Sequence, residues 1–143
     1  YSSSYALNPK IICQNDNVVA INSAIAVDLT GQIAAESVGP VMTSGSGGQL
    51  SFAIGAYLSK GGRSVVAIPS TAKGGQLSRI LPMLEPGTVV STPRTLADHV
   101  VTEYGIARLK GKTQRERALE LIAVAHPSFR AELKKEAERL YWP

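Results

Sequence analysis

A glycine-rich segment, Ser44-Gly45-Ser46-Gly47-Gly48-Gln49, is the sharpest candidate for chemistry in the sequence. Glycine takes backbone angles closed to other residues, so main-chain amides in such a loop can point outward. A predicted helix follows the loop, and its amino end adds about half a positive charge. These donors can bind phosphate or stabilise the oxyanion that forms when a thioester carbonyl is attacked. The alternative is a glycine-rich turn without a ligand, because the segment is neither a P-loop nor a Rossmann fingerprint.

Lysine at position 73 lies in a second loop, Ala72-Lys73-Gly74-Gly75, after an apolar run that predicts a strand. Ligands of open α/β sheets gather at the carboxyl ends of strands, where this loop is expected. The ammonium group could therefore meet a phosphate or a carbonyl group. A surface lysine in a turn is the competing interpretation.

The other candidate residues indicate catalytic chemistry less strongly. Neither His99 nor His126 lies in a recognisable nucleophile motif, and His126 before Pro127 is typical of a helix boundary. Gly45-Ser46-Gly47 is only a fragment of a nucleophile elbow. Glu103, between a predicted strand and a turn, favours a structural carboxylate over a catalytic one.

Charge supports an anionic small molecule. The 143 residues carry a net charge of +4, and residues 37–97 alone hold five basic residues against one acid, together with ten of the 13 glycines. Solvated surface cations are the alternative. Nucleic-acid binding is disfavoured because only 6% of residues are aromatic and they do not alternate with the basic ones.

The cysteine count and the hydropathy pattern limit the classes of protein to which this sequence can belong. The single Cys13 permits no internal disulfide, and no Cys/His cluster predicts a metal site. No apolar run reaches the roughly 20 residues of a membrane span, and the first residues do not read as a secretory signal. We expect a cytoplasmic protein without a membrane partner.

The elements that must position these loops alternate between strand and helix. Residues 17–29 predict a strand, joined by a turn at Thr30-Gly31-Gln32 to residues 33–37 as a hairpin. Residues 49–59 predict a helix with Leu50, Ile54, Tyr57 and Leu58 at helical spacing, and Gly55 suggests close packing. Further strands are predicted at 63–69 (covered on both faces), 79–81, 87–92 and 100–103. This spacing predicts an α/β fold.

The last thirty residues predict two helices. Thr113 and Glu116 form a capping box, and Pro127 suits the first turn of a second helix. Its residues Phe129, Leu133, Ala137 and Leu140 form an apolar stripe.

Nine segments in order resemble one family. They are Ala20-Ile21-Asn22-Ser23-Ala24-Ile25, Asp28-Leu29-Thr30-Gly31-Gln32, Gly45-Ser46-Gly47-Gly48-Gln49, Pro69-Ser70-Thr71-Ala72-Lys73-Gly74-Gly75, Ser78-Arg79-Ile80, Thr102-Glu103-Tyr104-Gly105-Ile106-Ala107, Leu109-Lys110-Gly111, Arg115-Glu116-Arg117-Ala118 and Ala125-His126-Pro127-Ser128-Phe129-Arg130. The chain is similar to the C-terminal domain of acetyl-CoA hydrolases and acyl-CoA:carboxylate CoA-transferases, such as the 4-hydroxybutyrate and succinyl-CoA:acetate enzymes. The resemblance implies that residues 1–143 form one domain of a longer enzyme.

The resemblance also implies a fold and a reaction. The fold is an open CoA-transferase-like (NagB/RpiA-type) α/β sheet with flanking helices and a C-terminal helical pair. In the reaction a glutamate attacks the acyl-CoA thioester, an enzyme glutamyl-CoA thioester forms, and a small carboxylate or water resolves it. Coenzyme A is then a substrate, with no covalently bound cofactor in the resting enzyme. The family's nucleophile lies upstream of this chain, so no catalytic residue is expected here and the isolated chain is expected to be inactive.

Supporting residues carry over from the family. Gly48 resembles the oxyanion donor, and Gly45, Gly47, Gly48, Lys73, Gly74 and Asn8 resemble groups that contact coenzyme A. Two positions depart from the pattern, because Ala26 and Ser51 stand where the family usually has acids. We expect the N-terminal domain of the same enzyme as a partner, and a homo-oligomer. The alternative function is a stand-alone CoA or acyl-CoA binding module without catalysis.

Overall fold

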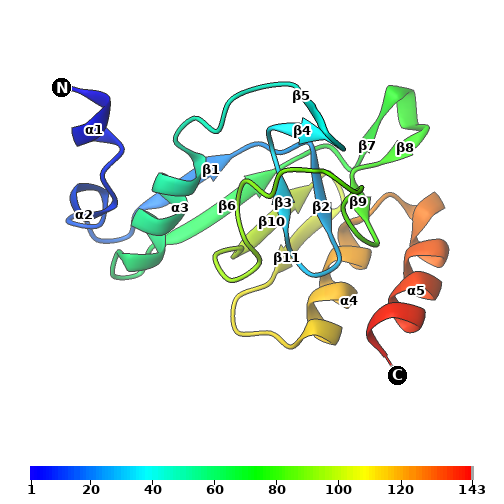
Figure 1. The fold of residues 1–143 in the computed structure, drawn as a ribbon. Coiled ribbons are helices and arrows are strands. Elements are labelled where there is room, and N and C mark those ends of the chain that lie inside the picture. The colour runs from blue at the N-terminus through cyan, green and yellow to red at the C-terminus, as the bar shows by residue number, and fades with distance from the viewer. Residues whose placement is uncertain (143) are drawn as a thin grey trace.

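The computed structural model describes residues 1–142 and has an α/β architecture (Figure 1). Its helices are α1 (Ser3–Ala6), α2 (Pro9–Ile12), α3 (Gln49–Leu58), the 3₁₀ turn η1 (Lys73–Gly75), α4 (Gln114–Val124) and α5 (Pro127–Tyr141). Its strands are β1 (Val19–Asn22), β2 (Ala26–Asp28), β3 (Ile33–Ala34), β4 (Ser37–Val38), β5 (Val41–Met42), β6 (Arg63–Ala67), β7 (Thr71–Ala72), β8 (Leu77–Ser78), β9 (Ile80–Leu81), β10 (His99–Thr102) and β11 (Gly105–Arg108). Within residues 1–142, no helix has both the length and the apolar character to cross a bilayer.

The main sheet has the order β1-β6-β10-β11. β1, β6 and β10 are parallel, and β11 returns antiparallel to β10. One face of this sheet buries Ala20, Ser64, Val66, Val100 and Ala107. The opposite face does not meet a second layer, so the prediction that 63–69 is covered on both faces is wrong within the described residues: Arg63 and Ala67 on β6 are exposed.

A second, three-stranded sheet, β3-β2-β9, packs against the buried face of the main sheet. The predicted hairpin around Thr30-Gly31-Gln32 is confirmed, since β2 and β3 pair antiparallel. The predicted continuous strand 17–29 is wrong, because the chain leaves the main sheet after Asn22 and enters the second sheet at Ala26. Periodicity alone cannot show this break, since both halves alternate in the same way.

Helix α3 covers β1 and β6, as its contacts with both strands show. The helix is confirmed, but the large apolar residues at helical spacing are not the ones that it buries: Leu50, Tyr57 and Leu58 are exposed, while Ala53 and Ala56 are buried. Small residues are used because α2 and the sheet lie close. A Cβ at Gly55 would stand 2.4 Å from Cγ2 of Ile12, which confirms the close packing predicted at that glycine.

The C-terminal helical pair is confirmed. The capping box at Thr113 and Glu116 opens α4, and His126 and Pro127 open α5. Residues 87–92 are not a strand; Thr92 alone forms a bridge, to Ile33. The pair places α5 beside the β7–β8 hairpin, where a cavity lies.

Candidate functional site

The glycine loop presents main-chain donors that nothing in the described residues uses. It joins β5 to α3, with Gly48 as the N-cap residue and no side-chain cap. Between Gly45 and Gly48, no amide N–H donates a hydrogen bond within residues 1–142. Gly47 has a φ of 53°, and no atom lies within 4 Å of where a Cβ would be at Gly45 or Gly47. These amides therefore have no hydrogen-bond partner within residues 1–142 and lie at the positive end of a ten-residue helix.

Packing fixes the inner side of this loop. A Cβ at Gly48 would lie 2.7 Å from Cδ2 of Leu7 and 3.1 Å from Cε2 of Phe52. Leu7 is followed in the chain by Asn8, the N-cap residue of α2. Asn8 caps α2, its Oδ1 accepting from the amide of Lys10 at 3.0 Å. The carboxamide oxygen of Asn8 is thus occupied by the cap, which leaves its NH₂ group for other partners.

Lys73 sits at the tip of the β7–β8 hairpin in an unusual conformation. Its φ is 49°, and Gly74 and Gly75 follow at 65° and 92°. A non-glycine residue in the left-handed region costs about 1 to 2 kcal/mol. The side chain is exposed and makes no ion pair with an acid of residues 1–142. Such strain at an exposed cation is typical of a functional position.

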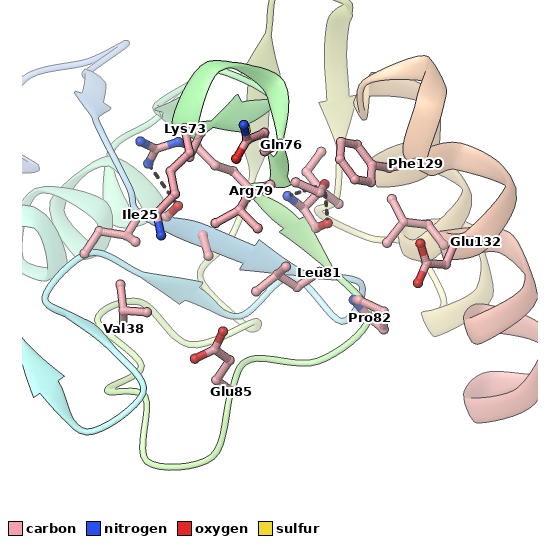
Figure 2. Close-up of a pocket in the computed structure, with 16 residues that line it drawn as sticks. Ile25, Val38, Lys73, Gln76, Arg79, Leu81, Pro82, Glu85, Phe129 and Glu132 are labelled. Carbon is pink, nitrogen blue, oxygen red and sulfur yellow. Dashed lines mark hydrogen bonds between the residues drawn. The ribbon is translucent and has the colours of Figure 1, made fainter.

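A cavity of about 490 Å³ lies below this hairpin (Figure 2). Its walls come from the hairpin, from β2 and β9, and from α5, and they are mostly apolar, with Ile25, Leu77, Leu81, Phe129 and Leu133 among them. Polar groups at its edge are Lys73, Gln76, Arg79, Glu85 and Glu132. The cavity therefore combines an apolar interior with an edge that carries cations and carboxylates, where Lys73 can meet the anionic part of a ligand.

Arg79 has a structural role in that wall. Its Nη1 donates to the carbonyl oxygens of Ala24 and Ile25 at 3.3 and 3.0 Å, and its Nε donates to Thr71. The guanidinium thus ties the start of β2 to the hairpin. Lys73 is the cation of this edge that stays available for a ligand.

Glu103 anchors the loop that leads into the hairpin. Its carboxylate accepts the hydroxyl of Ser70 at 2.6 Å and the amide of Ser70 at 2.9 Å. The Ser70 hydroxyl, helped by the Ser70 amide, holds the pKa of Glu103 below its ordinary value. The carboxylate is engaged by a buried serine, so the structural interpretation of Glu103 is favoured.

The pKa shift predicts a pH dependence. Because the folded-state pKa of Glu103 lies below the unfolded value near 4.5, the Ser70 contact stabilises the fold above that value and is lost as pH falls through the folded-state pKa. We expect Glu103→Gln to flatten the fall in thermal stability on acidification below about pH 4.5. Ser70→Ala, which removes the hydroxyl donor, should flatten the same limb. Identical acid limbs in wild type and both variants, measured by thermal melts, would contradict this assignment.

The candidate site residues do not lie together in one place but form two separate groups. Lys73 and Ala26 line the cavity, whereas Asn8, Gly45, Gly47, Gly48 and Gly74 are not among its lining residues. Figure 1 shows the amino end of α3 and the β7–β8 hairpin apart from each other. Sequence reasoning missed the wall from α5, because the apolar stripe through Phe129 and Leu133 reads as core. The segments around Ser70 and Glu103 were noticed separately, but their pairing was not.

Comparison with known proteins places these features in context. The family model described as the acetyl-CoA hydrolase/transferase C-terminal domain matches residues 1–137. The 4-hydroxybutyrate coenzyme A transferase of Clostridium kluyveri is 53% identical over 141 residues, which are 99% of this chain and 33% of the relative. The structure of RipA from Yersinia pestis aligns with a TM-score of 0.88 and 49% identity, over 96% of this chain and 31% of that one. The structure of 4-hydroxybutyrate CoA-transferase from Porphyromonas gingivalis aligns with a TM-score of 0.79 and 45% identity, over 99% of this chain and 31% of that one. The chain spans about a third of the length of these relatives.

Proposed function

Because the chain belongs to the acetyl-CoA hydrolase/transferase C-terminal domain family, we propose that it works as that domain in a longer enzyme, which moves coenzyme A between an acyl-CoA thioester and a carboxylate or water. The observation that carries this proposal is the set of unused amides from Gly45 to Gly48 at the amino end of α3. Donors placed where an oxyanion develops stabilise the transition state of acyl transfer more than the ground state.

In this proposal the chain binds and orients the thioester but does not attack it. The attacking group is a glutamate outside these residues, and the covalent intermediate is its thioester with coenzyme A. The Gly48 amide, with Gly45 and Gly47 beside it, donates to the carbonyl oxygen as it becomes an oxyanion. Asn8 offers its NH₂ group to the same part of the ligand. The isolated chain is then inactive, because it supplies donors without a nucleophile.

Lys73 and Gly74 serve the far end of the ligand. Coenzyme A is a long molecule, with its thiol at one end, a phosphorylated adenosine at the other and a diphosphate between them, so two separated groups of residues can hold it. The ammonium of Lys73 meets a phosphate at the cavity edge, and the apolar walls receive an uncharged part of the ligand. Ala26, which stands where the family usually has an acid, adds no further carboxylate to the two that already line this cavity, Glu85 and Glu132.

Two wider features belong to the same proposal. The sheet is of the open NagB/RpiA type, and its parallel order β1-β6-β10 is compatible with that assignment. The enzyme is a cytoplasmic homo-oligomer that binds no nucleic acid, and the free Cys13 is compatible with a reducing compartment. Its substrates are acyl-CoA and a small carboxylate, with no prosthetic cofactor.

Substitutions at Lys73 test the phosphate contact. In the longer enzyme, Lys73→Ala and Lys73→Gly should both weaken CoA binding by about tenfold, since each removes a charge-assisted contact. Lys73→Gly should not lower thermal stability, because glycine adopts a φ of 49° without steric cost. Lys60→Ala, which removes an exposed cation outside the cavity, is the matched control. An unchanged CoA dissociation constant by calorimetry in both Lys73 variants would exclude Lys73 from the site.

A further inference from the structure

One face of the main sheet is uncovered. The side chains on it alternate with the buried ones on the same strands: Val19 and Ile21 on β1, Arg63 and Val65 on β6, His99 and Val101 on β10, Ile106 and Arg108 on β11. Val19, Ile21 and Ile106 are 55%, 69% and 58% exposed. We call these eight residues the open sheet face.

Parallel strands rarely leave a face in water. Because the crossover connections put layers on both sides, parallel sheets occur almost only with both faces covered, and their strands are apolar throughout. β1, β6 and β10 have this apolar character and are parallel, yet α3, α4 and the second sheet all contribute to the other side. A hollow of about 410 Å³ is lined by Val19, Val65, Val101 and Ile106 together with Arg63, His99 and Arg108. The open sheet face therefore has the shape and composition of an unfilled interface.

Charge on the open sheet face selects the kind of partner. The guanidinium groups of Arg63 and Arg108 form no ion pair within residues 1–142. His99 lies opposite Arg108 in the sheet register, and its Nδ1 is buried 3.1 Å from Asp98 without a well-aligned hydrogen bond. A second copy packed on this face would place no carboxylate of its own face opposite Arg63 and Arg108, because the eight residues of the open sheet face include no acid. A nucleic acid would meet isoleucine and valine where aromatic rings are needed for stacking. The complementary surface is apolar at its centre and acidic at its edge.

We infer that the open sheet face is the docking surface for the N-terminal part of the same enzyme, which covers it with an amphipathic helical layer bearing carboxylates opposite Arg63 and Arg108. Relatives of this chain are about three times its length, and the matched family is a C-terminal domain, so about two thirds of such a protein precedes the matched part. The inference rests on the proposed role as a domain of a longer enzyme, but not on the glycine loop or Lys73.

Assembly in trans tests this surface without reading CoA transfer. The probe is the N-terminal two thirds of the Clostridium kluyveri relative, used only after circular dichroism and a cooperative thermal melt show that this fragment is folded. It is mixed with the 143-residue chain and followed by sedimentation velocity. Ile21→Asp places a charge on an exposed side chain, so the melting temperature of the isolated chain should hardly change, while the dissociation constant of the complex should rise about tenfold or more. Arg108→Glu should weaken the complex similarly at low salt and less at high salt. Leu119→Asp, on the exposed side of α4, is the matched control and should bind like wild type.

Three outcomes would overturn the inference. They are the absence of a complex with the wild-type chain, equal binding by Ile21→Asp and Leu119→Asp, and a wild-type homodimer that Ile21→Asp dissociates. The last would assign the face to a second copy. Loss of CoA transfer with assembly intact would instead count against the proposed function and leave this surface standing.

Discussion

We expect kcat of the longer enzyme to be about 100-fold lower in the Gly48→Pro variant than in the Gly48→Ala variant. Proline has no N–H, so it removes the proposed oxyanion donor, and loss of one such donor costs about 10²- to 10³-fold in turnover. The φ of Gly48, −100°, lies about 35° from the value proline prefers, so the ring requires only a modest backbone shift. The measurement is steady-state transfer from acetyl-CoA to a carboxylate.

Gly48→Ala is the control for this comparison. Both variants add a Cβ that meets Leu7 and Phe52, but alanine keeps the amide hydrogen. Their difference therefore isolates the donor from the packing, provided that both proteins melt at similar temperatures. If the proline variant turns over within about threefold of the alanine variant, well short of the loss that removing a donor causes, the Gly48 amide is not the oxyanion donor.

Asp28→Ala is expected to destabilise the fold by about 2 to 4 kcal/mol, which for a domain of this size is a fall in melting temperature of about 6 to 12 °C. Asp28 is 1% exposed, and its carboxylate holds the β2–β3 turn. Oδ1 accepts from the amide and the hydroxyl of Thr30 at 2.9 and 2.6 Å and from the amide of Gln32 at 3.0 Å, while Oδ2 accepts from Nε2 of Gln32. Truncation leaves these donors of the half-buried turn without their carboxylate partner.

The Thr30→Val variant measures what a single hydrogen bond contributes to stability, apart from the other hydrogen bonds of the turn. It removes the hydroxyl donor but leaves both amide bonds to Asp28, so a loss of about 1 kcal/mol is expected. The free energies of unfolding come from urea titration of the isolated chain. A loss at Asp28→Ala no larger than that at Thr30→Val would mean that the turn holds without its carboxylate.

Local signals in the sequence were enough to predict much of the fold. The capping box at Thr113 and Pro127 predicted both C-terminal helices, because those signals act within one turn of the chain. The turn at Gly31 predicted the β2–β3 hairpin for the same reason. The α/β class followed from the alternation of strand and helix signals.

Long-range packing explains what the sequence did not reveal. Helix α3 turns alanines inward and leaves Leu50, Tyr57 and Leu58 exposed, because α2 and the sheet approach too closely for large side chains. The departure of the chain from the main sheet after Asn22 depends on partners far along the chain. Lys73 and the glycine loop were identified locally, but their separation and the wall from α5 depend on how the elements assemble.

Titration of ¹⁵N-labelled protein with coenzyme A, followed through the amide resonances, tests the central claim most directly. If the loop before α3 and the β7–β8 hairpin hold the two ends of one ligand, the amides of Gly45, Gly47, Gly48 and Lys73 shift together and saturate with one dissociation constant. Resonances of α4 serve as the internal reference. Shifts that spare these four amides at millimolar coenzyme A, or that gather elsewhere on the molecule, would contradict the account.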